Sequence, residues 1–260
     1  MGRRLTLVLS VAALLVLTVV GLALAKGEKP IVVTVGNLRL TANGNFSPTA
    51  LPRSKFAPIT LNLSGKIETL DHTHPPAVRE VIIETDKNGT INAKGLPVCT
   101  SGKLQAQTTA KARAICKPAI VGEGTTQVEV AFPEQRPFVI KSELLVFNGG
   151  VSGGKTKVFV HAYLSSPVSA AVVVPVTVSR IHHGRYGLKT VAKVPKIAGG
   201  YGSPLSFSVK VGRKFTYKGK RQSYLLAKCP DGHLQAKGVG IFSGNVRLAG
   251  SLVRTCTPKG

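Results

Sequence analysis

The chain has 260 residues, of which 43% are hydrophobic and 5% aromatic, and its 35 Lys and Arg residues against 11 Asp and Glu residues give a formal net charge of +24. This hydrophobic content excludes a wholly disordered chain. The absence of Trp and the low aromatic content disfavour both a sugar-binding platform and a nucleic-acid site, since both kinds of site use exposed rings for stacking.

The N-terminus has the layout of a secretory signal peptide. Arg3 and Arg4 precede an uncharged run from Leu5 to Ala25, which closes on small residues that suit cleavage after Ala25. A run of ~20 apolar residues can also span a bilayer, so a single N-terminal membrane anchor is the alternative. We expect a signal peptide at residues 1–25 that is removed, and a mature chain that is secreted or associated with the cell envelope.

After residue 25 most apolar residues alternate with polar ones, which is the period of a half-buried strand. The ranges expected to form strands are 31–40, 59–67, 79–86, 126–132, 157–164, 172–181, 205–211 and 245–253. Turns are expected at Asn88-Gly89, Gly149-Gly150, Lys218-Gly219 and Ser243-Gly244. The one clear helical patch is a short Ala-rich segment that Thr108 caps and that ends near Cys116. The chain is therefore predicted to be all-β, with one short helix in its first half.

One octet pattern, C-x-x-G-x-L-Q-A, occurs twice in the chain. It begins at Cys99 as CTSGKLQA and at Cys229 as CPDGHLQA. The same offset places Lys66-Ile67 on Lys196-Ile197 and Gly89 on Gly219. We interpret this as an internal duplication that yields two tandem β-sandwich-like units, residues 26–165 and a basic unit at 166–260. A single large sandwich with recurring glycine turns is the alternative.

The four cysteines fit this interpretation, because each octet begins with one cysteine and is followed by another. An even number of cysteines in an exported chain indicates disulfides, although four cysteines allow three connectivities. The repeat favours the pairs Cys99–Cys116 and Cys229–Cys256. A zinc site is disfavoured because no C-x-x-C pair is present.

The stretch GGVSGGKT, from Gly149 to Thr156, matches both the phosphate loop and the G-x-S-x-G nucleophile elbow. Both motifs require a helix directly after the loop. Here the following KTKVFVHAYL alternates and is rich in β-branched residues, so it predicts a returning strand and a glycine-rich hairpin. We therefore expect no nucleotide, no other cofactor and no serine nucleophile at this stretch.

Histidines and carboxylates supply no clear catalytic set. His72 and His74 lie two residues apart beside Asp71, but Pro75-Pro76 marks an exposed connection and no third metal ligand is identifiable. His182 and His183 are adjacent in a predicted strand, so their side chains point apart. We expect no enzyme activity. A secreted hydrolase whose site the spacing hides is the alternative.

Positive charge is concentrated in the second half of the chain, where residues 166–260 hold 16 basic residues and a single acid, Asp231. In the densest stretch, KVGRKFTYKGKR, a continuous strand would place Lys210, Lys214 and Lys218 in a row on one face. Such a row suits a polyanion, whereas the alternative is a self-repelling surface that only keeps the protein soluble. The predicted polyanion-binding residues are Lys210, Arg213, Lys214, Lys218, Lys220 and Arg221.

Several family-like stretches accompany these features: LPVC before the first octet, LLVFNGG before the returning strand, and KIAGGYG followed by RKFTYKGKRQSYLLAKC. Together they resemble a group of uncharacterised exported proteins of actinobacterial type, and the likeness spans most of the mature chain. The resemblance implies a bacterial, exported protein in a monoderm envelope, and it supplies no catalytic residue.

These observations predict a non-catalytic, exported binding or structural protein of the cell envelope. Its expected partners are an anionic cell-envelope polymer or lipid head groups, reached through a basic sheet face.

Overall fold

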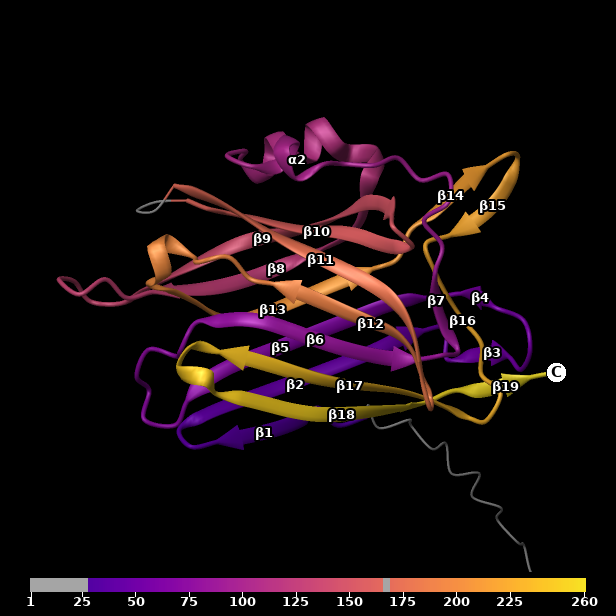
Figure 1. The fold of residues 1–260 in the computed structure, drawn as a ribbon, viewed down its shortest axis with the longest axis horizontal. Helices are drawn as coiled ribbons and strands as arrows, with labels where there is room; N and C mark the ends of the chain where they lie inside the picture. The colour runs from indigo at the N-terminus through magenta and orange to yellow at the C-terminus, as the bar shows by residue number, and fades with distance from the viewer. Residues whose placement is uncertain (1–27, 166–168) are drawn as a thin grey trace, which may run out of the picture.

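The computed structural model describes residues 28–165 and 169–260, and the expected signal peptide at residues 1–25 lies outside these ranges. The described chain is mostly strands with a small helical share, so the predicted all-β class is confirmed (Figure 1). Within these ranges no helix is both long and apolar enough to cross a membrane.

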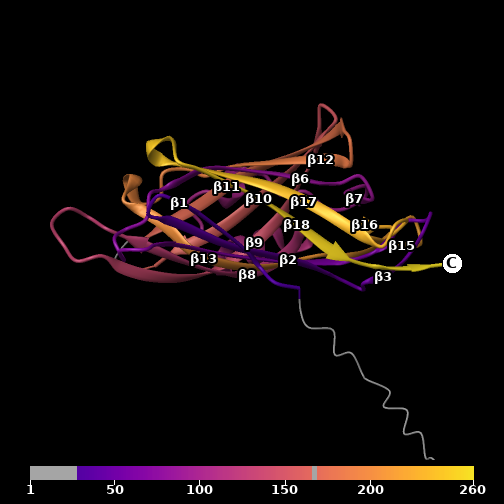
Figure 2. The ribbon, with the colours of Figure 1, turned by 90° about the horizontal axis from the view of Figure 1, so that it is seen from below.

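Twelve strands form one antiparallel sheet. In spatial order they are β1 (Ile31–Val35), β2 (Leu38–Ser47), β5 (Thr60–Thr69), β13 (Gly202–Val211), β8 (Ile120–Val130), β9 (Phe138–Ser152), β10 (Lys155–Leu164), β11 (Ala170–His183), β12 (Tyr186–Lys193), β6 (Val78–Asp86), β17 (His233–Phe242) and β18 (Arg247–Thr255). The sheet curls back on itself, so that β1 and β18 lie side by side in a flattened, closed arrangement (Figure 2).

A buried arginine on β18 ties the two ends of the sheet together. The Arg254 guanidinium donates hydrogen bonds from Nε to the Gly44 carbonyl at 2.7 Å and to Asn45 Oδ1 at 2.8 Å, both on β2. It also lies 3.1 Å from Glu28 Oε2. These charge-assisted contacts are among the stronger hydrogen bonds in proteins, and they hold β18 against β2 and Glu28.

The core lies inside the curled sheet, because alternate residues of every strand point inward. One end of the interior is filled by Val128, Val130, Ile140 and Leu164. The other end is filled by Phe46, Leu51, Ala227 and the Cys229–Cys256 disulfide.

Two short helices cover part of the outer face. They are α1 (Ser101–Leu104) and α2 (Thr109–Cys116), which the 3₁₀ turn η1 (Lys117–Ala119) follows. Leu104 and Ala112 from the helices pack against Leu145 and Phe147 of β9. The predicted helix is confirmed, and the Thr108 side chain caps it by accepting a hydrogen bond from the Lys111 amide.

Three small sheets gather at one end of the molecule, on the right in Figures 1 and 2. They are formed by β3 (Ala50–Pro52) with β19 (Thr257–Lys259), by β4 (Ala57–Pro58) and β7 (Gly89–Ile91) with β16 (Leu225–Ala227), and by β14 (Lys214–Tyr217) with β15 (Lys220–Ser223). The opposite end carries η2 (Ala198–Gly200) and η3 (Ser243–Asn245).

Every range expected to form strands overlaps a strand of the large sheet. One strand range and one expected turn differ locally from the prediction. The first range is divided into β1 and β2 by a turn at Gly36, whose φ of +56° glycine adopts at little cost. The GGVSGGKT hairpin is confirmed, but its turn is at Gly153-Gly154 and Gly149-Gly150 lies within β9.

The octet does not mark a structural repeat. In the first copy Ser101–Leu104 is α1, whereas in the second copy His233 to Ala236 begins strand β17. Strands of the two expected units also alternate in one sheet, since β13 lies between β5 and β8 and β6 lies between β12 and β17. The two tandem sandwiches are therefore corrected to one shared sheet, whereas both predicted disulfides, Cys99–Cys116 and Cys229–Cys256, are present.

Candidate functional site: a basic end

The basic stretch after β13 forms a hairpin rather than one long strand. The chain leaves the sheet at Gly212, whose φ is +152°, and a side chain there would meet the Thr60 backbone. Strands β14 and β15 then pair around a turn at Lys218-Gly219, where both residues have positive φ. The predicted row is therefore wrong, because Lys210 lies on β13, Lys214 on β14 and Lys218 in the turn.

Four of the six predicted residues are exposed on this hairpin: Lys214, Lys218, Lys220 and Arg221. The other two have different surroundings. Lys210 lies on the large sheet rather than on the hairpin, directly opposite Glu123 across the β13–β8 pair. Arg213 donates to the carbonyl oxygens of Lys117 at 3.2 Å and Ile120 at 2.7 Å, which fastens the base of the hairpin to η1 and β8.

The hairpin is fixed to the body of the protein by its apolar side. Phe215 packs against the core cluster that contains Tyr224 and Leu96. The Tyr217 ring lies on Gly95, where any side chain would overlap it. Because β-strand side chains alternate, this packing leaves Lys214 and Arg221 on the opposite, outer side.

Further basic side chains reach the same end from distant parts of the sequence. Arg53 and Lys55 lie in the exposed loop between β3 and β4, and Lys259 lies on β19, which pairs with β3. Lys228 follows β16, and its Nζ is 5.4 Å from the centre of the exposed Phe56 ring. Lys94 precedes the glycine beneath Tyr217. We call this set the basic end; it comprises Arg53, Lys55, Lys94, Lys214, Lys218, Lys220, Arg221, Lys228 and Lys259.

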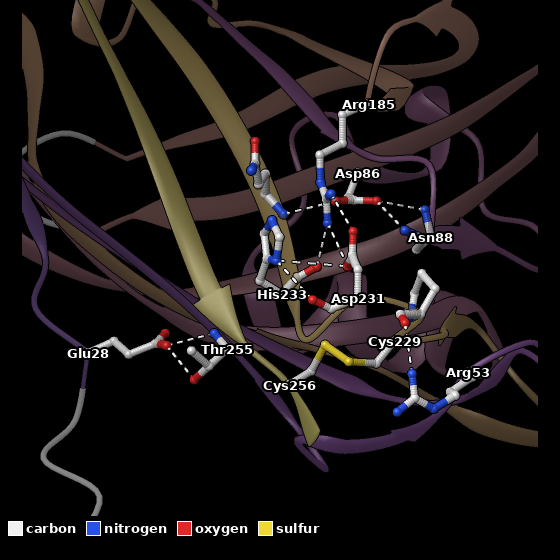
Figure 3. The surroundings of a disulfide bond; sticks show 12 residues. Glu28, Arg53, Asp86, Asn88, Arg185, Cys229, Asp231, His233, Thr255 and Cys256 are labelled. Atoms are coloured by element: carbon white, nitrogen blue, oxygen red, sulfur yellow. Dashed lines mark hydrogen bonds and ion pairs between the residues drawn. A yellow bond between two sulfur atoms is a disulfide. The ribbon is translucent and has the colours of Figure 1, made fainter. Parts of the chain in front are cut away.

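The carboxylates of Asp86, Asp231 and Glu28 are engaged by groups outside the basic end (Figure 3). Arg185 contacts Asp86 through Nε at 2.7 Å and Asp231 through Nη1 at 2.6 Å. The hydrogen bond from Arg185 is the main reason that the pKa of Asp231 falls to about 2. Glu28 accepts hydrogen bonds from the amide and hydroxyl of Thr255, both at 2.7 Å. These carboxylates are therefore engaged by groups outside the basic end, and they leave its charge uncompensated.

The paired histidines lie elsewhere, in the loop that folds over β5, β8 and β13. His74 Nδ1 is 2.6 Å from Glu129 Oε2, and a shallow depression beside it is bordered by His72, Glu68 and Ser206. The His74 ring forms its hydrogen bond with Glu129, and no serine hydroxyl in the described ranges bonds to this His74–Glu129 pair. In the described ranges no three His, Cys, Asp or Glu side chains converge as a metal site would require.

Comparison with known proteins gives no relative: no protein-family model, curated protein or solved structure matches the chain. Its functional interpretation is therefore based on its own charges and contacts.

Proposed function

We propose that the protein is a non-catalytic, exported component of a bacterial cell envelope that uses its basic end to bind anionic polymers or lipid head groups. The two disulfides indicate an oxidising compartment, which agrees with export. The apolar N-terminal run and the family-like stretches support the same setting.

One observation carries the proposal. In the described ranges, none of the nine basic side chains at the basic end forms an ion pair with a carboxylate. Like charges repel one another when they gather at one end of a molecule, so an unpaired cluster favours a polyanionic partner that neutralises it.

Salt-dependent binding to inorganic polyphosphate tests the proposal. Replacing Lys214, Lys218, Lys220 and Arg221 together with Gln should weaken binding and flatten the dependence of affinity on salt. Each phosphate contact that is lost lowers the number of counterions released when the polymer binds. A reduction of about 0.7 in the logarithmic slope is expected per lost contact, as for single-stranded nucleic acids.

A charge-matched variant provides the control. Arg136, Lys193, Lys196 and Arg247 are four exposed bases away from the basic end, and replacing them with Gln removes the same net charge. This control should retain most of the affinity and slope. Equal losses in the two variants would show that only net charge matters, and failure to bind either polyphosphate or anionic vesicles at low salt would refute the proposal.

A further inference from the structure

We infer that the basic end docks on an anionic lipid bilayer and that Phe56 enters the interfacial layer of that bilayer. This docking rests on the proposed function. Of the two partners proposed there, it selects lipid head groups rather than a soluble polymer. Its basis is an exposed apolar side chain beside Lys55 and Lys228 in the basic end, where a purely electrostatic site would not need one.

Phe56 is 44% exposed, and it ends the loop Arg53-Ser54-Lys55-Phe56, in which every residue is exposed. Lys228 Nζ lies 5.4 Å from the ring centre, so the ring is flanked by Lys55 in sequence and by Lys228 in space. An aromatic ring among basic side chains is the composition that favours the interface of an anionic membrane. A hydrated polymer offers no apolar phase for such a ring.

The loop is held firmly on both sides. The Arg53 amide donates to the Lys259 carbonyl at 3.2 Å, and the Cys229 amide donates to the Pro52 carbonyl at 2.9 Å. On the other side, Ala57 pairs with Ala227. The loop is therefore anchored at both ends, and Ala57 packs against the core cluster that contains the Cys229–Cys256 disulfide. Figure 3 shows this disulfide close to Arg53 at the start of the loop.

The described chain begins beside the C-terminal end of β18. Glu28 is fixed by Thr255 and Arg254, and the apolar run of the sequence ends three residues earlier at Ala25. Docking through Phe56 does not require the N-terminal run to be either cleaved or retained, because it depends on Phe56 and the bases beside it.

Tryptophan fluorescence tests this inference directly, because the chain has no Trp and Phe56→Trp would provide a single fluorophore. We expect its emission to shift to the blue, and to be quenched by brominated acyl chains, on vesicles of phosphatidylglycerol and phosphatidylcholine. Neither change should occur on vesicles of phosphatidylcholine alone. A retained apolar run would not mimic this result, since the signal reports only the position of residue 56.

Val139→Trp is the matched control. Val139 is 48% exposed and lies on β9 next to the loop at the opposite end of the molecule. Its emission should not change on the same vesicles. Quenching in both the Phe56→Trp and the Val139→Trp variants would show that the protein does not dock through the basic end alone. Vesicle binding without quenching in the Phe56→Trp variant would overturn the inference.

Phe56→Ser separates the inference from the proposed function. It should lower affinity for the anionic vesicles about tenfold, the factor expected for partial burial of one aromatic side chain, and leave polyphosphate binding unchanged. If the wild-type protein binds polyphosphate but not vesicles, the proposed function stands and the bilayer inference fails. If it binds neither, both fail.

Discussion

His161 is a fully buried histidine on β10, beneath the helices that cover the outer face. Its Nε2 lies 3.0 Å from the Gln107 carbonyl oxygen, which makes Nε2 the protonated nitrogen of the neutral ring, and Nδ1 is buried without a hydrogen-bond partner. Burial lowers the pKa of His161. Protonation would place a second N–H in an apolar pocket with no acceptor, so the folded protein keeps this ring neutral.

Stability should therefore fall in mild acid. The unfolded chain binds a proton on this ring at a pKa of about 6.5, and the folded chain binds it only at lower pH. Above a pH of about 6.5 the buried neutral ring costs the folded protein no stability. Below it the free energy of unfolding falls, because only the unfolded chain gains the proton. His161→Gln keeps a donor for Gln107 without titrating, so the difference between its urea midpoints at about pH 7 and about pH 5 should be smaller than in the wild-type protein. An unchanged difference would contradict the assignment.

Contacts between residues could be predicted from the sequence where a local rule or the octet supplied the partner, as for the helix cap and the two disulfides. Thr108 as a helix cap was predictable, because its partner is three residues away. Asp231 stood out as the one acid of its half, but the sequence did not predict that Arg185 would bind it. That contact depends on the pairing of β6 with both β12 and β17.

Among the elements, strands with strict alternation were predicted well, and β6 and β10 match their expected ranges closely. Strand β17 was missed because it contains two glycines and begins within the repeated octet. The two octets differ because their neighbours differ: Leu104 is buried with the helical cluster, whereas the Gln235 amide donates to Asp86. Tertiary contacts thus override a shared local pattern.

The attachment of the basic hairpin can be tested at Gly95. A methyl group there would overlap the Tyr217 ring, and the φ of +82° is unfavourable for alanine. We expect Gly95→Ala to cost about 1–3 kcal/mol. It should also increase hydrogen exchange of the amides in β14 and β15 and weaken polyphosphate binding.

Gly102→Ala is the control for this prediction. Gly102 lies in α1, a side chain there would meet nothing within 4 Å, and its φ is not positive. It should leave both hydrogen exchange and binding unchanged. Matching behaviour of the two variants would mean that the Tyr217 contact does not position the hairpin.

For the whole molecule, the sequence predicted four of the nine residues of the basic end, because those four are nearly contiguous in the chain. The other five come from four separate segments, which meet because β16 pairs with β4 and β7 and β19 pairs with β3. These are long-range pairings of very short strands, and local periodicity does not encode them. The same pairings place Phe56 among the bases.

Lysine acetylation mapped by mass spectrometry, with and without polyphosphate, tests the central claim most directly. The bound polymer should slow acetylation at the basic end, at Lys55, Lys94, Lys214, Lys218, Lys220, Lys228 and Lys259. Lys193 ends β12 and Lys196 lies two residues before η2, and both are exposed; they should react at unchanged rates. Equal protection of all these lysines, or protection centred outside the basic end, would contradict the account.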